Sequence, residues 1–149
     1  MEFINYILSA IIASLGIFCG VVLGYIAKEE LKPGKKYLIL LQYVLIAVMI
    51  VLMVYFRFEE EIVFLFVAAL FFVIYKTRFK KQIMPEIYVL FALIFSKAPA
   101  AAFIVWSSLI FLYGFPTGSL LYMKKNWIKL CLIVSLMFFF ISIILYLVF

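Results

Sequence analysis

The stretch GIFCGVVLG at residues 16–24 places three glycines at intervals of four within a long apolar run. Residues spaced by four lie on one face of an α-helix. Because glycine has no side chain, such a face lets a second helix approach closely, as is common in lipid. A shorter copy, GFPTG, occupies residues 114–118, and the two stretches hold five of the six glycines. We therefore predict a helix-packing face made of Gly16, Gly20, Gly24, Gly114 and Gly118.

The composition is that of a membrane protein. Of the 149 residues, 70% are hydrophobic and 13% are charged, whereas soluble domains are about half apolar and about a quarter charged. This excludes an ordinary water-soluble domain. It predicts an all-α, polytopic transmembrane helix bundle that forms one integral membrane domain over residues 1–149, with the lipid bilayer as its first partner. The net charge of +6 comes from basic residues that border apolar segments, so we assign them to topology and expect no nucleic-acid partner.

Six apolar segments are separated by short, charged loops. We predict spans over residues 3–27, 37–56, 58–75, 83–96, 99–123 and 127–149. The first loop contains Pro33-Gly34, which favours a turn. The region from 83 to 123 is too long for one span, and Lys97 and Pro99 interrupt it. We divide it there, with Ser96 as a helix cap and Pro99 in the first turn of the next helix.

The distribution of charge predicts the topology. Loops one, three and five hold eleven of the 13 basic residues, so the positive-inside rule makes them cytoplasmic and leaves both termini outside. A five-span alternative, in which 83–95 re-enters the membrane, would place Lys124, Lys125 and Lys129 outside, and we reject it. The expected location is a prokaryotic plasma membrane. The hairpin 1–56 resembles 99–149, because both combine a glycine pair, a basic turn and an apolar span, although chance explains this likeness equally well.

Polar residues within the spans gather in the cytoplasmic half. Pro116 cannot donate a backbone hydrogen bond, so we expect the fifth helix to kink or open there. A freed carbonyl and nearby side chains would then form a polar pocket for a neutral or cationic ligand. The alternative is that these residues make ordinary interhelical contacts. The candidate pocket residues are Gln42, Pro116, Thr117, Ser119 and Ser135.

Three other residues, one lysine and two cysteines, have side chains that could form an ion pair, a metal site or a disulfide. Lys97 is the outer charge, which either pairs with a glutamate of 59–61 inside the membrane or reaches the interface with its stem. Cys19 and Cys131 lie in apolar spans without metal-ligand spacing, so we expect free thiols. No metal or cofactor is predicted.

Two functions fit this sequence. The chain has no His and no Asp and no catalytic motif, so we expect no enzyme activity. One hypothesis is a permease-like transporter for a small solute, which works as an oligomer through the glycine face. The alternative is a structural or accessory subunit of a larger membrane complex. The protein partners would be further copies of the chain or other membrane subunits.

Overall fold

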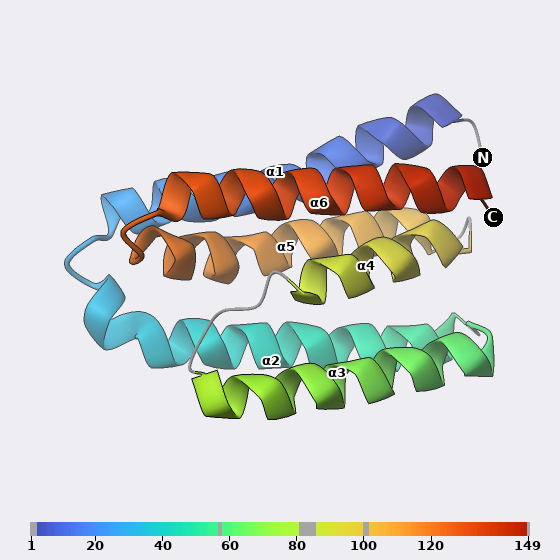
Figure 1. Ribbon diagram of the computed structural model, residues 1–149, viewed down its shortest axis with the longest axis horizontal. Helices are drawn as coiled ribbons and strands as arrows, with labels where there is room; N and C mark the ends of the chain where they lie inside the picture. The colour runs from blue at the N-terminus through green and yellow to red at the C-terminus, as the bar shows by residue number, and fades with distance from the viewer. Residues whose placement is uncertain (1–2, 57, 81–85, 100–101, 149) are drawn as a thin grey trace.

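The computed structural model describes residues 3–56, 58–80, 86–99 and 102–148, with the backbone alone for 72–80 and 86. Every regular element in these ranges is an α-helix. The helices run roughly along one axis and alternate in direction, so the two chain ends lie at the same end of the bundle (Figure 1). Their bounds are α1 (Phe3–Ile26), α2 (Leu31–Tyr55), α3 (Glu60–Lys80), α4 (Glu86–Lys97), α5 (Phe103–Tyr122) and α6 (Trp127–Val148).

Four of the described helices, α1, α2, α5 and α6, are long and apolar enough to cross a membrane. Their length and composition are those of membrane-spanning helices. The fourth predicted span differs from them, because α4 has only 12 residues. At about 1.5 Å per residue it is about 18 Å long, whereas a bilayer core is about 30 Å thick.

The first loop is shorter than the sequence predicted, and the predicted Pro33-Gly34 turn was wrong. Helix α2 begins at Leu31 rather than at residue 37, and the first loop is reduced to a turn over residues 27–30. Pro33 lies in the first turn of α2, where a backbone N–H has no intrahelical partner and proline is tolerated. The Gly34 N–H donates to the Glu30 carbonyl at 2.8 Å. Pro33-Gly34 is therefore part of a helix and not of a tight turn.

The predicted division of this region at Lys97 and Pro99 is confirmed, but the predicted helix cap and helix start there were wrong. Helix α4 continues to Lys97, and the Ser96 hydroxyl donates backward to the Leu93 carbonyl at 2.8 Å, so Ser96 does not cap the next helix. Helix α5 begins at Phe103, after a turn in which the Ala102 N–H donates to the Pro99 carbonyl at 2.8 Å. Predictions for residues 1–2, 57, 81–85, 100–101 and 149 lie outside the described residues.

The contact between α1 and α5 is the most extensive one among the described helices. A Cβ added to Gly16 would meet the Phe111 backbone, and one added to Gly114 would lie 2.5 Å from the Ile17 nitrogen. At the other end of the contact, Gly24 faces Tyr122. The two glycine stretches thus pack against each other within one chain, with both helices running in the same direction. The face that we had assigned to an oligomer is occupied by α5, so a partner would have to bind elsewhere.

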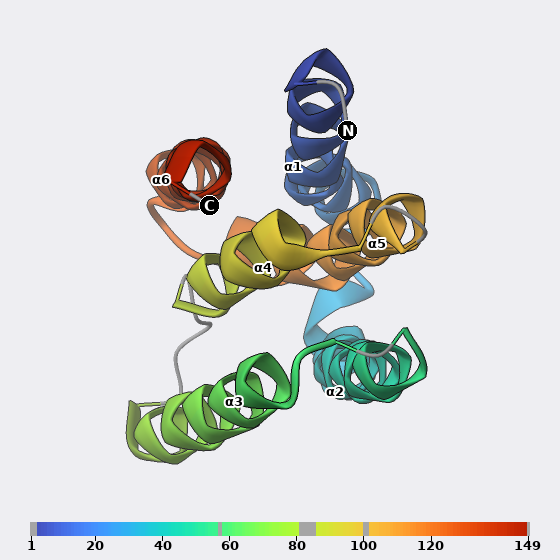
Figure 2. The ribbon, with the colours of Figure 1, turned by 90° about the vertical axis from the view of Figure 1, so that its right-hand side faces the viewer.

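Helix α4 lies in the middle of the bundle, surrounded by α5, α6 and the α2–α3 hairpin (Figure 2). Most of its described apolar side chains are buried, and the Phe95 ring packs at a tilt against Phe103 of α5 with centroids 4.5 Å apart. By contrast, α2 buries only four side chains, among them Met49 and Met53, which face α5. Among the four long apolar helices, α2 is thus the least buried.

Candidate functional site

A polar contact joins the α2–α3 hairpin to the rest of the bundle. The side-chain amide of Gln42 on α2 donates to the Thr117 hydroxyl on α5 at 2.8 Å. The Thr117 hydroxyl in turn donates to the Tyr113 carbonyl at 2.9 Å, one turn earlier in α5. Thr117 is buried and Gln42 is half-buried. Because apolar surroundings exclude water, this short chain of hydrogen bonds fixes the position of α2 against α5.

The structure brings together some of the predicted pocket residues and separates others. Gln42 and Thr117 are bonded to each other, whereas the Ser119 hydroxyl donates to the Gly20 carbonyl of α1 at 2.8 Å. Ser119 thus belongs to the contact between α1 and α5. Pro116 is buried inside an uninterrupted α5, so the expected opening of the helix is absent. Lys97 is half-exposed at the C-terminal end of α4, where the helix dipole favours a cation.

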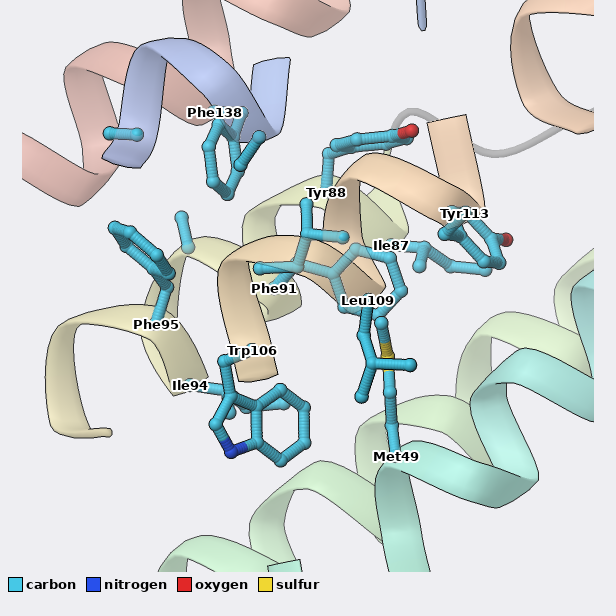
Figure 3. Packing of buried hydrophobic residues seen from close by; sticks show 14 of the residues in the cluster. Met49, Ile87, Tyr88, Phe91, Ile94, Phe95, Trp106, Leu109, Tyr113 and Phe138 are labelled. Carbon is cyan, nitrogen blue, oxygen red and sulfur yellow. The ribbon is translucent and has the colours of Figure 1, made fainter. Parts of the chain in front are cut away.

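Sequence reasoning missed Tyr88, which the structure places beside Thr117. Its ring is fully buried and lies 5.9 Å from Tyr113 and 6.2 Å from Phe138, measured between centroids. Figure 3 shows the Tyr88 and Tyr113 hydroxyls pointing to the same side of the aromatic cluster. The Tyr88 hydroxyl is turned toward Thr117 and lies near Cys131, but no described group is within hydrogen-bond distance of it. A buried hydroxyl without a partner is uncommon and costly.

Ser135 is the second buried hydroxyl without a partner. Cys131, Ser135 and Phe138 are spaced by four and three residues, so they lie on one face of α6. The ring contact between Phe138 and Tyr88 turns this face toward α4. We refer to these neighbouring groups as the polar cluster, which consists of Gln42, Tyr88, Tyr113, Thr117, Cys131 and Ser135.

The sequence contains little that distinguishes Tyr88 from the other tyrosines. Ten tyrosines occur in the chain, and most lie near span ends, where an interfacial belt explains them. Tyr88 lies early in the shortest predicted span. Because α4 is short and lies in the interior of the bundle, the Tyr88 hydroxyl reaches the depth of Thr117. The spacing of apolar residues alone does not indicate that depth.

The polar cluster is chemically neutral. No charged side chain is buried among the described residues, and those residues contain no group of His, Cys, Asp or Glu that could hold a metal ion. Cys19 and Cys131 are free thiols. The cluster therefore offers an amide, hydroxyls and a thiol, which can bind a solute by hydrogen bonds but supply no strong acid or base.

A separate groove of about 570 Å³ lies along the start of α6. It is lined by Lys125, Asn126, Trp127, Ile128, Lys129, Leu132, Ile133 and Leu136. Most of these side chains are exposed, and they lie on a different face of α6 from Cys131 and Ser135. The groove is thus at the outer surface of the bundle and does not reach the polar cluster.

Comparison of the chain with protein-family models, curated proteins and solved structures gave no match. Functional inference therefore rests on the chemistry of the residues themselves.

Proposed function

We propose that the chain is a six-span membrane protein that carries a small polar solute across the bilayer through the polar cluster. The observation that supports this most is the pair of unpartnered hydroxyls, Tyr88 near Thr117 and Ser135 on the neighbouring helix α6. Polar groups without partners are expensive inside a membrane, and they mark the paths of solutes and ions. If these hydroxyls served helix packing alone, we would expect each to have a hydrogen-bond partner or to be replaced by an apolar group.

The low burial of α2 suggests how a solute would reach the cluster. Transporters commonly move one group of helices against another around a fixed site. Here α1 and α5 are locked together by glycine contacts, and α4 and α6 pack on them, which forms a rigid scaffold. Movement of the hairpin would break the Gln42–Thr117 bond and expose both side chains. The flexible side chains of Met49 and Met53 would adapt to the shift.

The proposed membrane orientation follows from one basic end of the bundle. The turns between α1 and α2 and between α5 and α6 lie at the same end (Figure 1), and they carry lysines such as Lys28 and Lys125. By the positive-inside rule this end is cytoplasmic, and the two termini are outside in a prokaryotic plasma membrane. In this orientation α4 is the fourth span, although by itself it is shorter than the bilayer core is thick.

Cysteine labelling tests this orientation against a five-span arrangement. Ala98→Cys should react with a membrane-impermeant maleimide in intact cells, and Lys125→Cys should react only after the membrane is opened. A re-entrant fourth segment would reverse both results, because it returns the chain to the cytoplasmic side at residue 98. The unaltered protein is the control, since Cys19 and Cys131 lie within helices.

Solute flux into vesicles tests the proposed activity. The purified chain is reconstituted into liposomes, and uptake is followed by light scattering during osmotic challenge with small polar solutes. We expect uptake of at least one solute well above that of protein-free vesicles, with the chain as the sole protein species. Absence of flux, with recovery of other chains in fixed ratio from the native membrane, would instead support the accessory-subunit function.

A further inference from the structure

We infer that the solute is uncharged and carries oxygen acceptors, and that the Tyr88 and Ser135 hydroxyls donate hydrogen bonds to it. This inference rests on the proposed function and specifies the chemistry of the same site. It is drawn from which buried groups lack partners and from which kinds of group are absent around them.

The unpartnered groups share one chemical property. Among the described residues, three buried side-chain atoms have no hydrogen-bond partner, and they belong to Tyr88, Trp106 and Ser135. All three can donate, and the indole of Trp106 can only donate. A solute that satisfies Trp106 must therefore present an acceptor atom, and the same acceptors suit the two hydroxyls, which can also accept. In small polar solutes such acceptors are chiefly hydroxyl or carbonyl oxygens.

The three groups belong to α4, α5 and α6, which pack on one another. Trp106, Tyr113 and Thr117 are spaced by seven and four residues, so they share one side of α5 over about 16 Å at 1.5 Å per residue. Tyr88 packs on Tyr113 midway along this side, and Ser135 lies on the face of α6 that Tyr88 contacts. In Figure 3 Trp106 lies toward the opposite end of the cluster from Tyr88. Donors are thus available from the outer half to the inner half of the bundle.

The absence of buried charge decides between charged and uncharged solutes. An ion moved into a site of low dielectric constant needs an opposite charge or many oriented dipoles to offset its desolvation. The described residues bury no charged side chain, so the cluster offers no such compensation. An uncharged solute loses only hydrogen bonds to water, and the unpartnered donors replace them.

Two substitutions that remove single oxygen atoms test the inference in reconstituted vesicles. Glycerol and urea serve as uncharged probes, and glycerol 3-phosphate and choline serve as charged ones. We expect the uncharged probes alone to enter, and Tyr88→Phe and Ser135→Ala each to slow entry by about three- to tenfold, the effect of one neutral hydrogen bond. The thermal midpoint of each variant should equal or exceed that of the unaltered chain, because an unpaired polar group has been removed.

Tyr6→Phe is the matched control. The buried Tyr6 hydroxyl donates to the Ser142 carbonyl at 2.9 Å and joins α1 to α6, away from the cluster. Its removal should lower the thermal midpoint and leave flux per folded protein unchanged. If a hydroxyl in the cluster is structural, bridged for example by a buried water, its variant will behave like Tyr6→Phe, and the inference is overturned.

The remaining outcomes separate this inference from the proposed function. If a charged probe enters and Thr117→Val stops it, transport through the cluster stands but the solute class is wrong. If flux of the uncharged probes survives both Tyr88→Phe and Ser135→Ala unchanged, the donors are wrong. If no probe enters at all, the transport function itself fails, and the inference falls with it.

Discussion

Replacement of Gly118 by leucine should prevent α1 and α5 from packing and thereby destroy the fold. A Cβ at residue 118 would meet the Ile17 carbonyl and would lie 2.8 Å from the Val21 nitrogen. These are backbone atoms of a neighbouring helix, so no rotation of a side chain relieves the clash. Added methylenes in a packed core cost about 1–3 kcal/mol, and a whole leucine here should cost more. We expect a fall in Tm of at least roughly 6–12 °C, or no folded protein.

Gly34→Leu provides the control with the same change of residue. A Cβ at Gly34 has no atom within 4 Å, and the residue lies in the first turn of α2. Leucine has a better helix propensity than glycine by roughly 1 kcal/mol, so Tm should stay level or rise slightly. The measurement is thermal unfolding in detergent, with size-exclusion chromatography to detect aggregation. An unchanged Tm for Gly118→Leu would show that α1 and α5 are not in close contact.

Gly20→Leu separates an internal role of the glycine face from a role in association. A Cβ at residue 20 would meet the Phe115 carbonyl and would lie 2.6 Å from the Gly114 carbonyl oxygen. We therefore expect the isolated chain to lose stability as Gly118→Leu does. Normal stability of the chain together with loss of a native partner would support the original assignment of this face to association.

The sequence predicted the existence and order of all six helices, because each is an apolar run, long in most cases and short in α4, between charged residues. It failed at boundaries where one residue suits two structures. Pro33 fits a turn and the first turn of a helix equally well. Ser96 fits an N-cap, but its hydroxyl can also bond backward within a helix, as it does to Leu93. Local sequence does not distinguish these cases, since the choice depends on how the helices pack.

The candidate site was predicted only in part for a related reason. The sequence placed Gln42 and Thr117 in the same, cytoplasmic half of the predicted spans, and in the structure their side chains are hydrogen-bonded to each other. The sequence could not give the rotation of each helix about its own axis. Thr117 and Ser119 are two residues apart and therefore point in different directions, one toward α2 and the other toward α1. Tyr88 was missed because its depth depends on the short length of α4.

Thr117→Val and Gln42→Met should nearly abolish solute flux while leaving the protein folded. Each change removes the bond between α2 and α5 and keeps the size of the side chain. Interhelical hydrogen bonds in membranes contribute about 0.6 kcal/mol on average, so the loss of stability should be small. The effect on flux should be much larger, at least about tenfold, because the solute would lose a binding group and leave the remaining polar atoms unsatisfied.

Ser107→Ala is the control for these two variants. Ser107 is also a buried hydroxyl on α5, but it donates within its own helix, to the Ile104 carbonyl at 2.9 Å. Its removal should leave flux unchanged. Flux and thermal stability are measured on the same preparations, so a flux that falls only in proportion to the folded fraction would contradict a direct role. If flux is normal in both Thr117→Val and Gln42→Met, the bond between these residues only holds α2 in place, because a solute path through it requires at least one of them.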